Sequence, residues 1–174
     1  MKKIIILSLC SMILLCGCES KNKEATYEAK LGQIQELKKS ELTIPEFSVD
    51  IEGKIDGALT NIDLSNVTLY DFVADVTVYD IDPDSEIYRE KWTGVKLKDV
   101  LNTKGITEYD TLDFKSTGNI TVRYKKEEIN DNMYLIFYRN DMLISKSEDT
   151  PIMLFVSDLK NRYWVPSLTR MDIM

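Results

Sequence analysis

Alternating acidic side chains give one segment of this sequence the potential to bind a metal ion. Asp80, Asp82 and Asp84 are spaced two residues apart, and carboxylate oxygens are ligands that Ca²⁺ prefers. An EF-hand loop that starts at Asp80 needs glycine at its sixth position and glutamate at its twelfth, but this sequence has Ser85 and Lys91 there. The three aspartates are therefore candidate calcium ligands, with a solvated acidic turn between two strands as the favoured alternative.

Two tryptophans and two arginines are the candidates for binding a cofactor. The indole rings of Trp92 and Trp164 could stack on a planar group, although filling the core is the favoured interpretation because tryptophan usually buries most of its surface. The guanidinium groups of Arg139 and Arg170 suit bidentate binding of a phosphate or carboxylate. Both arginines lie among many acidic residues, so surface ion pairs are the favoured alternative, as they are for Arg123.

The N-terminal residues predict export and a lipid anchor. Two lysines precede an apolar run that ends at Leu15, as in a secretory signal peptide, and this run is shorter than the ~20 residues that span a bilayer. Residues 15–18, Leu-Cys-Gly-Cys, resemble the lipobox of bacterial lipoproteins. We therefore expect a signal peptide over residues 1–17 and a diacylglyceryl or palmitate lipid on Cys18, which anchors the protein on the outer face of the cytoplasmic membrane. The alternative is a buried N-terminal helix with incidental cysteines.

The residue types that are absent limit the chemistry of the mature protein. The sequence has no histidine, which excludes Ser-His-Asp and Cys-His catalysis and histidine-rich zinc sites. No cysteine follows Cys18, so a lipidated chain has no disulfide, thiolate nucleophile or thiolate metal ligand. The whole chain has 22 basic and 29 acidic residues, a net charge of −7, which disfavours nucleic acid as a partner. No catalytic residue is predicted.

The chain after the signal peptide divides into a tether and one domain. Residues 18–44 are rich in charged and polar side chains, and their apolar residues recur at helical spacing. These apolar residues are Tyr27, Leu31, Ile34 and Leu37. The pattern predicts an amphipathic helix between residues 24 and 40, with plain disorder as the alternative. Residues 45–174 are long enough for a single folded domain.

Period-two alternation of apolar and polar side chains predicts that this domain is mostly β-structure. The expected strands are 47–51, 72–78, 112–114, 120–124 and 134–138. A continuous apolar run at 152–156 predicts a central strand that is buried on both faces. Residues 97–103 predict a short helix that ends before Gly105. The expected fold class is α+β, rich in β-structure, with one or two short helices.

The order of motifs along residues 47–173 resembles the sulfite-oxidase-type molybdopterin-binding domain. Residues 92–101, followed by Gly105, look like the "GV-x-L-x-D-L-L-x-x-x-G" segment of that family. Residues 139–143 are similar to its "dG-x-x-L" turn, residues 150–156 to its "GP-x-x-L-V-x-P" segment, and residues 163–173 to its closing "W-V-x-x-L-x-x-I-x-V". The resemblance implies a sulfite-oxidase-like fold and molybdopterin as the cofactor.

This chain departs from the catalytic members of that family at the residues that hold the cofactor. Those members bind molybdenum through a cysteine and use histidine toward the pterin phosphate, and this sequence offers neither after Cys18. It therefore resembles a short, cysteine-less branch of exported proteins. The expected function is binding of a small ligand or an envelope protein without catalysis. The alternatives are a molybdopterin-dependent oxidoreductase and an accessory subunit of a membrane redox complex.

Overall fold

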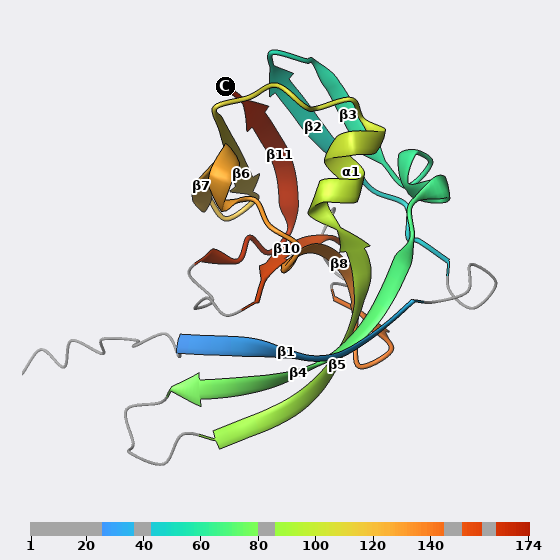
Figure 1. Ribbon diagram of the computed structural model, residues 1–174, viewed down its shortest axis with the longest axis vertical. Helices are drawn as coiled ribbons and strands as arrows, with labels where there is room; N and C mark the ends of the chain where they lie inside the picture. Colours follow the sequence, from blue (N-terminus) through green and yellow to red (C-terminus); the bar gives the residue numbers. More distant parts are fainter. Residues whose placement is uncertain (1–25, 37–42, 80–85, 145–150, 158–162) are drawn as a thin grey trace, which may run out of the picture.

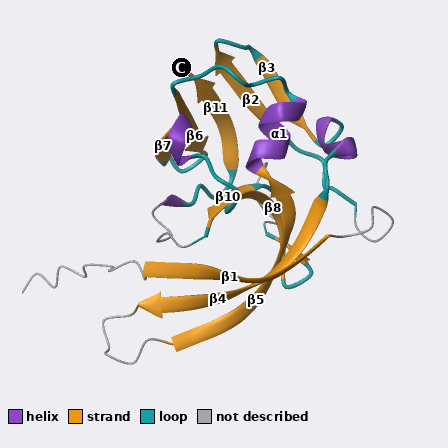
Figure 2. Cartoon of the chain, viewed as in Figure 1, coloured by secondary structure: helices purple, strands orange, loops and turns teal. Residues whose placement is uncertain are grey.

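The computed structural model describes residues 26–36, 43–79, 86–144, 151–157 and 163–174. The lipidation prediction at Cys18 and the calcium prediction at Asp80, Asp82 and Asp84 lie outside these described residues. The described residues form two β-sheets, a single α-helix and short 3₁₀ helices, so the predicted β-rich α+β fold class is confirmed (Figures 1 and 2).

The first sheet has the strand order β1-β4-β5-β8-β10, with the short strand β9 paired to β8. Its pairings are all antiparallel. The strands of this sheet are β1 (Thr26–Glu36), β4 (Leu69–Tyr79), β5 (Glu86–Lys96), β8 (Met133–Arg139), β9 (Met142–Leu143) and β10 (Met153–Val156). Strands β1, β4 and β5 are the longest, and together they extend away from the second sheet as a three-stranded arm (Figure 1).

The second sheet has the strand order β3-β2-β11-β6-β7. The strands are β2 (Ser48–Gly53), β3 (Gly57–Thr60), β6 (Thr111–Ser116), β7 (Thr121–Lys125) and β11 (Leu168–Ile173). Strand β11 pairs parallel with β2 and antiparallel with β6. Short 3₁₀ helices at Asp63–Asn66 and Lys126–Glu128 lie in connections between strands. The last described strand of the chain is therefore the central strand of this sheet.

The helix α1 (Leu97–Thr103) follows β5 directly, and its predicted bounds are confirmed. Leu97, Val100 and Leu101 are buried, as their shared face predicts. Gly105 follows the helix with a φ of 71°, a left-handed conformation that glycine adopts without strain. Ile106 N donates to the Leu101 carbonyl oxygen at 2.8 Å, and this hydrogen bond closes the end of the helix.

Strand β10 corrects one prediction. Its four residues are buried on both faces, as the continuous apolar run predicts. However, it is the end strand of its sheet and not a central one. Apart from β8, strand β10 is bridged only at Leu154 among the described residues. Leu154 and Val165 each donate a backbone hydrogen bond of 2.9 Å to the carbonyl oxygen of the other. The segment around Val165 and the hydrophobic core together bury β10. A continuous apolar run therefore predicts burial of a strand but not its position in the sheet.

Strand β1 corrects a second prediction. Residues 26–36 pair with β4, so both the helix predicted between residues 24 and 40 and the alternative of disorder are wrong for them. The register shifts between Leu31 and Ile34, where Gly32 and Gln33 together lie opposite Val73. This β-bulge requires glycine, because a Cβ on Gly32 would lie 2.7 Å from the Val73 carbonyl oxygen. The first sheet thus begins ahead of the domain start predicted at residue 45.

The first sheet is so strongly curved that the end of β10 lies beside β1. Ser157, directly after β10, accepts a hydrogen bond from Leu31 N at 3.1 Å and donates one to the Ala29 carbonyl oxygen at 3.3 Å. The hydroxyl therefore joins the edge of β1 to the end of β10 and nearly closes the sheet into a barrel.

Candidate functional site

The two tryptophans predicted as cofactor candidates lie in the hydrophobic core. Trp92 is 2% exposed and Trp164 is 8% exposed. Their rings meet edge to face at a centroid distance of 6.2 Å, and Phe155 packs against both. Trp164 Nε1 donates to the Val156 carbonyl oxygen at 2.9 Å. The core interpretation is confirmed, and neither indole presents an open face for stacking.

The two candidate arginines belong to different sheets and are engaged by carboxylates. Arg139, at the end of β8, binds Glu90 through two nitrogens, with Nε 2.9 Å from Oε2, and its guanidinium lies 5.1 Å from the centre of the Trp92 ring. Arg170, on β11, pairs with Asp172 and Glu52. The structure does not bring the two arginines together, and the ion-pair interpretation is confirmed for both.

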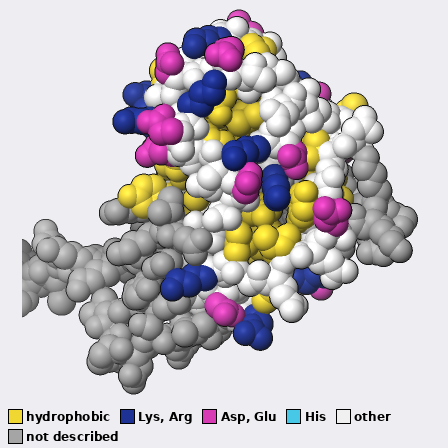
Figure 3. All heavy atoms as spheres, viewed as in Figure 1, with side chains coloured by type: hydrophobic (Ala, Val, Ile, Leu, Met, Phe, Trp, Pro, Cys, Tyr) yellow, Lys and Arg dark blue, Asp and Glu magenta, His cyan; other side chains and the backbone are white. Residues whose placement is uncertain are grey.

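Arg123 has the same use. It holds Asp113 on the neighbouring strand through two hydrogen bonds of 2.6 and 2.7 Å. Figure 3 shows acidic and basic side chains interspersed on one face of the molecule, without a patch of a single sign. Arg123, Arg139 and Arg170 thus each hold a carboxylate on a neighbouring strand.

These placements do not fit a molybdopterin cradle. A pterin needs an accessible planar or polar surface, whereas Trp92 and Trp164 cover each other and Arg139 covers Trp92. Phosphate binding needs free donors, whereas Arg139 and Arg170 already hold carboxylates. Among the described residues, no group of three histidine, cysteine, aspartate or glutamate side chains is placed to hold a metal ion.

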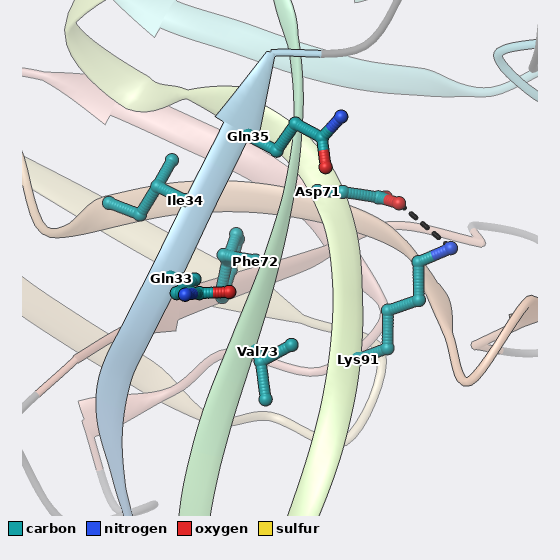
Figure 4. Close-up of a pocket in the computed structure, with 7 residues that line it drawn as sticks. All are labelled: Gln33, Ile34, Gln35, Asp71, Phe72, Val73 and Lys91. Carbon is teal, nitrogen blue, oxygen red and sulfur yellow. Dashed lines mark ion pairs between the residues drawn. The ribbon is translucent and has the colours of Figure 1, made fainter.

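A hollow on the face of the β1-β4-β5 arm is the best candidate for a binding site. It has a volume of about 490 Å³, within the range of about 300–1,000 Å³ that is usual for small-ligand pockets. Figure 4 shows the side chains of Gln33, Gln35, Asp71 and Lys91 along it. Val73 supplies an aliphatic wall, and the hollow is open to solvent.

The register of the three strands brings these side chains together. Gln35 lies opposite Asp71, and Val73 lies opposite Lys91. The β-bulge at Gly32 and Gln33 adds one residue to β1 beside Val73, so that Gln33 and Gln35 lie on the same face as Asp71. Without the extra residue, the alternation along β1 would put these two glutamines on the opposite face.

Lys91 is the centre of the charges in this hollow. Its ammonium nitrogen lies 2.8 Å from Asp71 Oδ2 and 2.8 Å from Asp141 Oδ1. The hydrogen bonds to Asp141 and Asp71 raise the pKa of Lys91, so the side chain stays charged at neutral pH. Thr93 Oγ1 donates to the second oxygen of Asp71. The lysine charge is thus shared between two carboxylates.

The turn between β8 and β9 places Asp141 beside Lys91. Asn140 and Asp141 both have left-handed conformations, with φ of 52° and 61°, as a tight hairpin turn requires. Asn140 N donates to the Lys91 carbonyl oxygen at 2.7 Å, and Lys91 N donates to Asn140 Oδ1 at 2.9 Å. This hairpin turn fixes the carboxylate at the side of the hollow.

The residues of this hollow were not singled out by the sequence. Gln33 and Gln35 fall in the segment predicted as a tether, and Asp71 and Lys91 are ordinary charged residues of strands. The sequence holds one weak indication of them: Gln33 and Gln35 stand on either side of Ile34, and such alternation of polar and apolar residues is typical of a strand. The hollow can bind a small polar ligand by hydrogen bonds, because its carboxamides are exposed and have no hydrogen-bond partner among the described residues.

Comparison with models of known protein families gives no match for this chain, and the search of curated proteins gives none either. In the part of the chain that the structure describes, no helix has the length and apolar character needed to cross a membrane.

Proposed function

We propose that this protein is an extracytoplasmic lipoprotein whose β-rich domain binds a ligand or protein partner without catalysing a reaction. Cys18 carries the lipid that anchors it to the cytoplasmic membrane, residues 1–17 are removed as a signal peptide, and the domain has a sulfite-oxidase-like fold. The lipobox at residues 15–18 supports the anchor, and the order of motifs over residues 47–173 supports the fold.

The hollow on the β1-β4-β5 arm is the observation that carries the binding function. Gln33 and Gln35 offer hydrogen-bonding groups with no partner among the described residues, and the hollow is large enough for a small ligand. Asp71 and Lys91 add charged groups that are held in place by Thr93 and Asp141. Polar groups that are fixed before binding lower the entropy cost of holding a ligand.

The resemblance to the molybdopterin-binding domain concerns the scaffold and not the cofactor. Fold and function are separable, because function depends on the residues of a site. The buried Trp92 and Trp164 and the paired Arg139 and Arg170 leave no described cradle for a pterin. The oxidoreductase and accessory-subunit alternatives are not favoured by any contact in the described residues.

Metabolic labelling with palmitate tests the anchor. We expect the wild-type chain to incorporate the label and to fractionate with membranes, and Cys18→Ser to lose both properties. Cys10→Ser is the matched control, because Cys10 lies in the apolar run ahead of the lipobox and should leave labelling unchanged. Unlabelled wild-type protein in the membrane fraction would contradict lipidation at Cys18.

A ligand screen and an elemental analysis test the domain function. The full chain, purified in detergent, should gain thermal stability with a compound from a library of polar metabolites, because a ligand that binds only the folded state raises the midpoint. Gln33→Ala with Gln35→Ala should abolish the shift. Stoichiometric molybdenum in protein made in a cofactor-competent host, together with turnover of an electron acceptor, would instead support the oxidoreductase.

A further inference from the structure

The charges in the hollow select against anionic ligands. The Lys91 ammonium is already held by Asp71 and Asp141, each at 2.8 Å. These three side chains together carry one excess negative charge, and the whole chain has a net charge of −7. A phosphate or carboxylate group that approaches Lys91 would meet repulsion from both of these carboxylates. The ligand is therefore uncharged or cationic.

The carboxamides of Gln33 and Gln35 give the hollow a set of groups that both donate and accept hydrogen bonds. Each carboxamide has one acceptor oxygen and two N–H donors. The two residues lie two positions apart on β1, a separation of about 7 Å along a strand. Neither has a hydrogen-bond partner among the described residues. Such paired groups match a ligand whose own groups also donate and accept, and hydroxyl groups have this property.

Asp71 and Lys91 complete the recognition of hydroxyl groups. The Asp71 carboxylate accepts bonds from Thr93 and Lys91 and retains further acceptor sites, since two carboxylate oxygens offer about four lone-pair positions. The Lys91 ammonium has three donors, of which Asp71 and Asp141 use two. Val73 provides an aliphatic wall against which the C–H face of a ring can lie.

An extended peptide is a poorer match for this place in the fold. Peptides that bind to sheets obtain much of their affinity from backbone hydrogen bonds at a free edge. The hollow lies on the face of β4, and the backbone of β4 is paired with β1 on one side and with β5 on the other. Recognition here must come from side chains, which suits a small ring compound with several hydroxyl groups.

We propose that this hollow binds a neutral saccharide, with Gln33, Gln35, Asp71 and Lys91 contacting its hydroxyl groups. This proposal rests on the proposed binding function and names the class of its ligand. The saccharide ring lies across β1 and β4, and the ligand remains partly in solvent because the hollow is open.

Isothermal titration and saturation-transfer NMR of the full chain in detergent test this proposal. The probes are maltose, cellobiose and chitobiose, with inorganic phosphate and trialanine as comparison compounds. We expect at least one of the three saccharides to bind at millimolar concentrations or below, and phosphate and trialanine not to bind. Gln33→Ala combined with Gln35→Ala should weaken the saccharide about tenfold or more, because each lost hydrogen bond contributes a few-fold.

Matched variants keep the result interpretable. Thr121→Ala alters an exposed strand residue of the second sheet and should bind the saccharide like the wild type. Gln33→Glu combined with Gln35→Glu retains acceptors but removes donors, and should also weaken binding. Circular dichroism of each variant verifies that it is folded.

Two results would overturn the proposal. One is the absence of binding by all three saccharides to folded wild-type protein, and the other is equal binding by the wild type and the double alanine variant. A different compound that stabilises the wild type but not the double alanine variant would reject the saccharide class and retain the proposed binding function. Lipidation of Cys18 is tested separately by palmitate labelling, and its outcome does not affect the interpretation of the saccharide-binding results.

Discussion

Charged side chains on neighbouring strands pair across both sheets of this protein. Arg123 holds Asp113 between β7 and β6, and Lys91 holds Asp71 between β5 and β4. Such cross-strand pairs at the surface contribute little each, but a carboxylate that is largely buried depends on its partners. Asp71 and Asp113 are both of this second kind, since their side chains are 13% and 8% exposed. The contribution of these contacts can be measured one residue at a time.

The Thr93 hydroxyl should be the most informative of these contacts. Thr93 is 1% exposed, and its hydroxyl donates to the Asp71 carboxylate. Thr93→Val keeps the shape of the side chain and removes the donor, so we expect a loss of about 2 kcal/mol in the free energy of unfolding. Urea denaturation measures it. Thr121→Val, at an exposed strand position, is the control and should change the free energy by less than about 0.5 kcal/mol. Equal effects of the two variants would contradict a role for the hydroxyl.

Asp172 should make the stability of the protein depend on acid pH. Burial raises the pKa of this carboxyl, but hydrogen bonds and charges from Arg170 and Lys115 outweigh it and hold the pKa below the ordinary value of 3.8. As the pH falls, the unfolded chain therefore takes up a proton at Asp172 before the folded protein does, and the stabilisation is lost on passing through the folded pKa. The stabilisation is fully present above 3.8.

Denaturation at a series of pH values from neutral to acid tests this assignment. We expect the free energy of unfolding of the wild type to fall more steeply below pH 3.8 than that of Asp172→Asn. Lys115→Met removes one of the two cationic partners and should give an intermediate slope. Parallel slopes for the wild type and Asp172→Asn would show that Asp172 is not responsible.

At the scale of elements, the sequence predicts those whose pattern is local. The helix α1 was predictable because Leu97, Val100 and Leu101 share a face and Gly105 follows. Strand β1 was not, because its bulge imitates a helix: Leu31 and Ile34 are three residues apart but lie opposite Ala74 and Phe72, which are both on one face of β4. An extra residue in a strand produces the spacing that a helix would give.

The candidate site was unpredictable for the same reason. Gln33 and Gln35 reach Asp71 and Lys91 only through the pairing of β1 with β4 and of β4 with β5. Neither the bulge nor the pairing is visible in the residues of one strand. Trp92 was the opposite case, since its size alone predicts a place in the core.

Gly94 tests the close contact between β5 and β8. The register between these strands shifts next to Gly94, and a Cβ there would lie 2.2 Å from the Leu135 carbonyl oxygen. The clash is with the backbone of β8, and a shift of that strand would strain its pairing. We therefore expect Gly94→Ala to lower the free energy of unfolding by about 3 kcal/mol. Gly118→Ala is the control, since its nearest atom is Ser116 Oγ at 3.6 Å and its φ is not positive. Similar midpoints for both variants in urea would contradict the tight packing.

At the scale of the whole molecule, the chain alternates between the two sheets. Strand β1 belongs to the first sheet, β2 and β3 to the second, β4 and β5 to the first, and β11 at the end returns to the second. Ile51 on β2 pairs with Met171 on β11, so the second sheet cannot form until most of the chain is present. The chain therefore passes repeatedly from one sheet to the other, and neither sheet corresponds to a separable segment of sequence.

This alternation predicts a single cooperative unfolding transition, which a mutation in one sheet and a probe in the other can test. Met171 is 2% exposed in the second sheet, whereas both tryptophans pack against Phe155 of strand β10 in the first sheet. Met171→Ala should cost about 2–5 kcal/mol through the cavity that it leaves, and the midpoint from tryptophan fluorescence should fall with the midpoint from circular dichroism. Met142→Ala, at a position that is 60% exposed, should move neither. If Met171→Ala lowered only the circular dichroism midpoint and left tryptophan fluorescence unchanged, the sheets would be unfolding independently, because a defect in one would no longer destabilise the packing around Trp92 and Trp164.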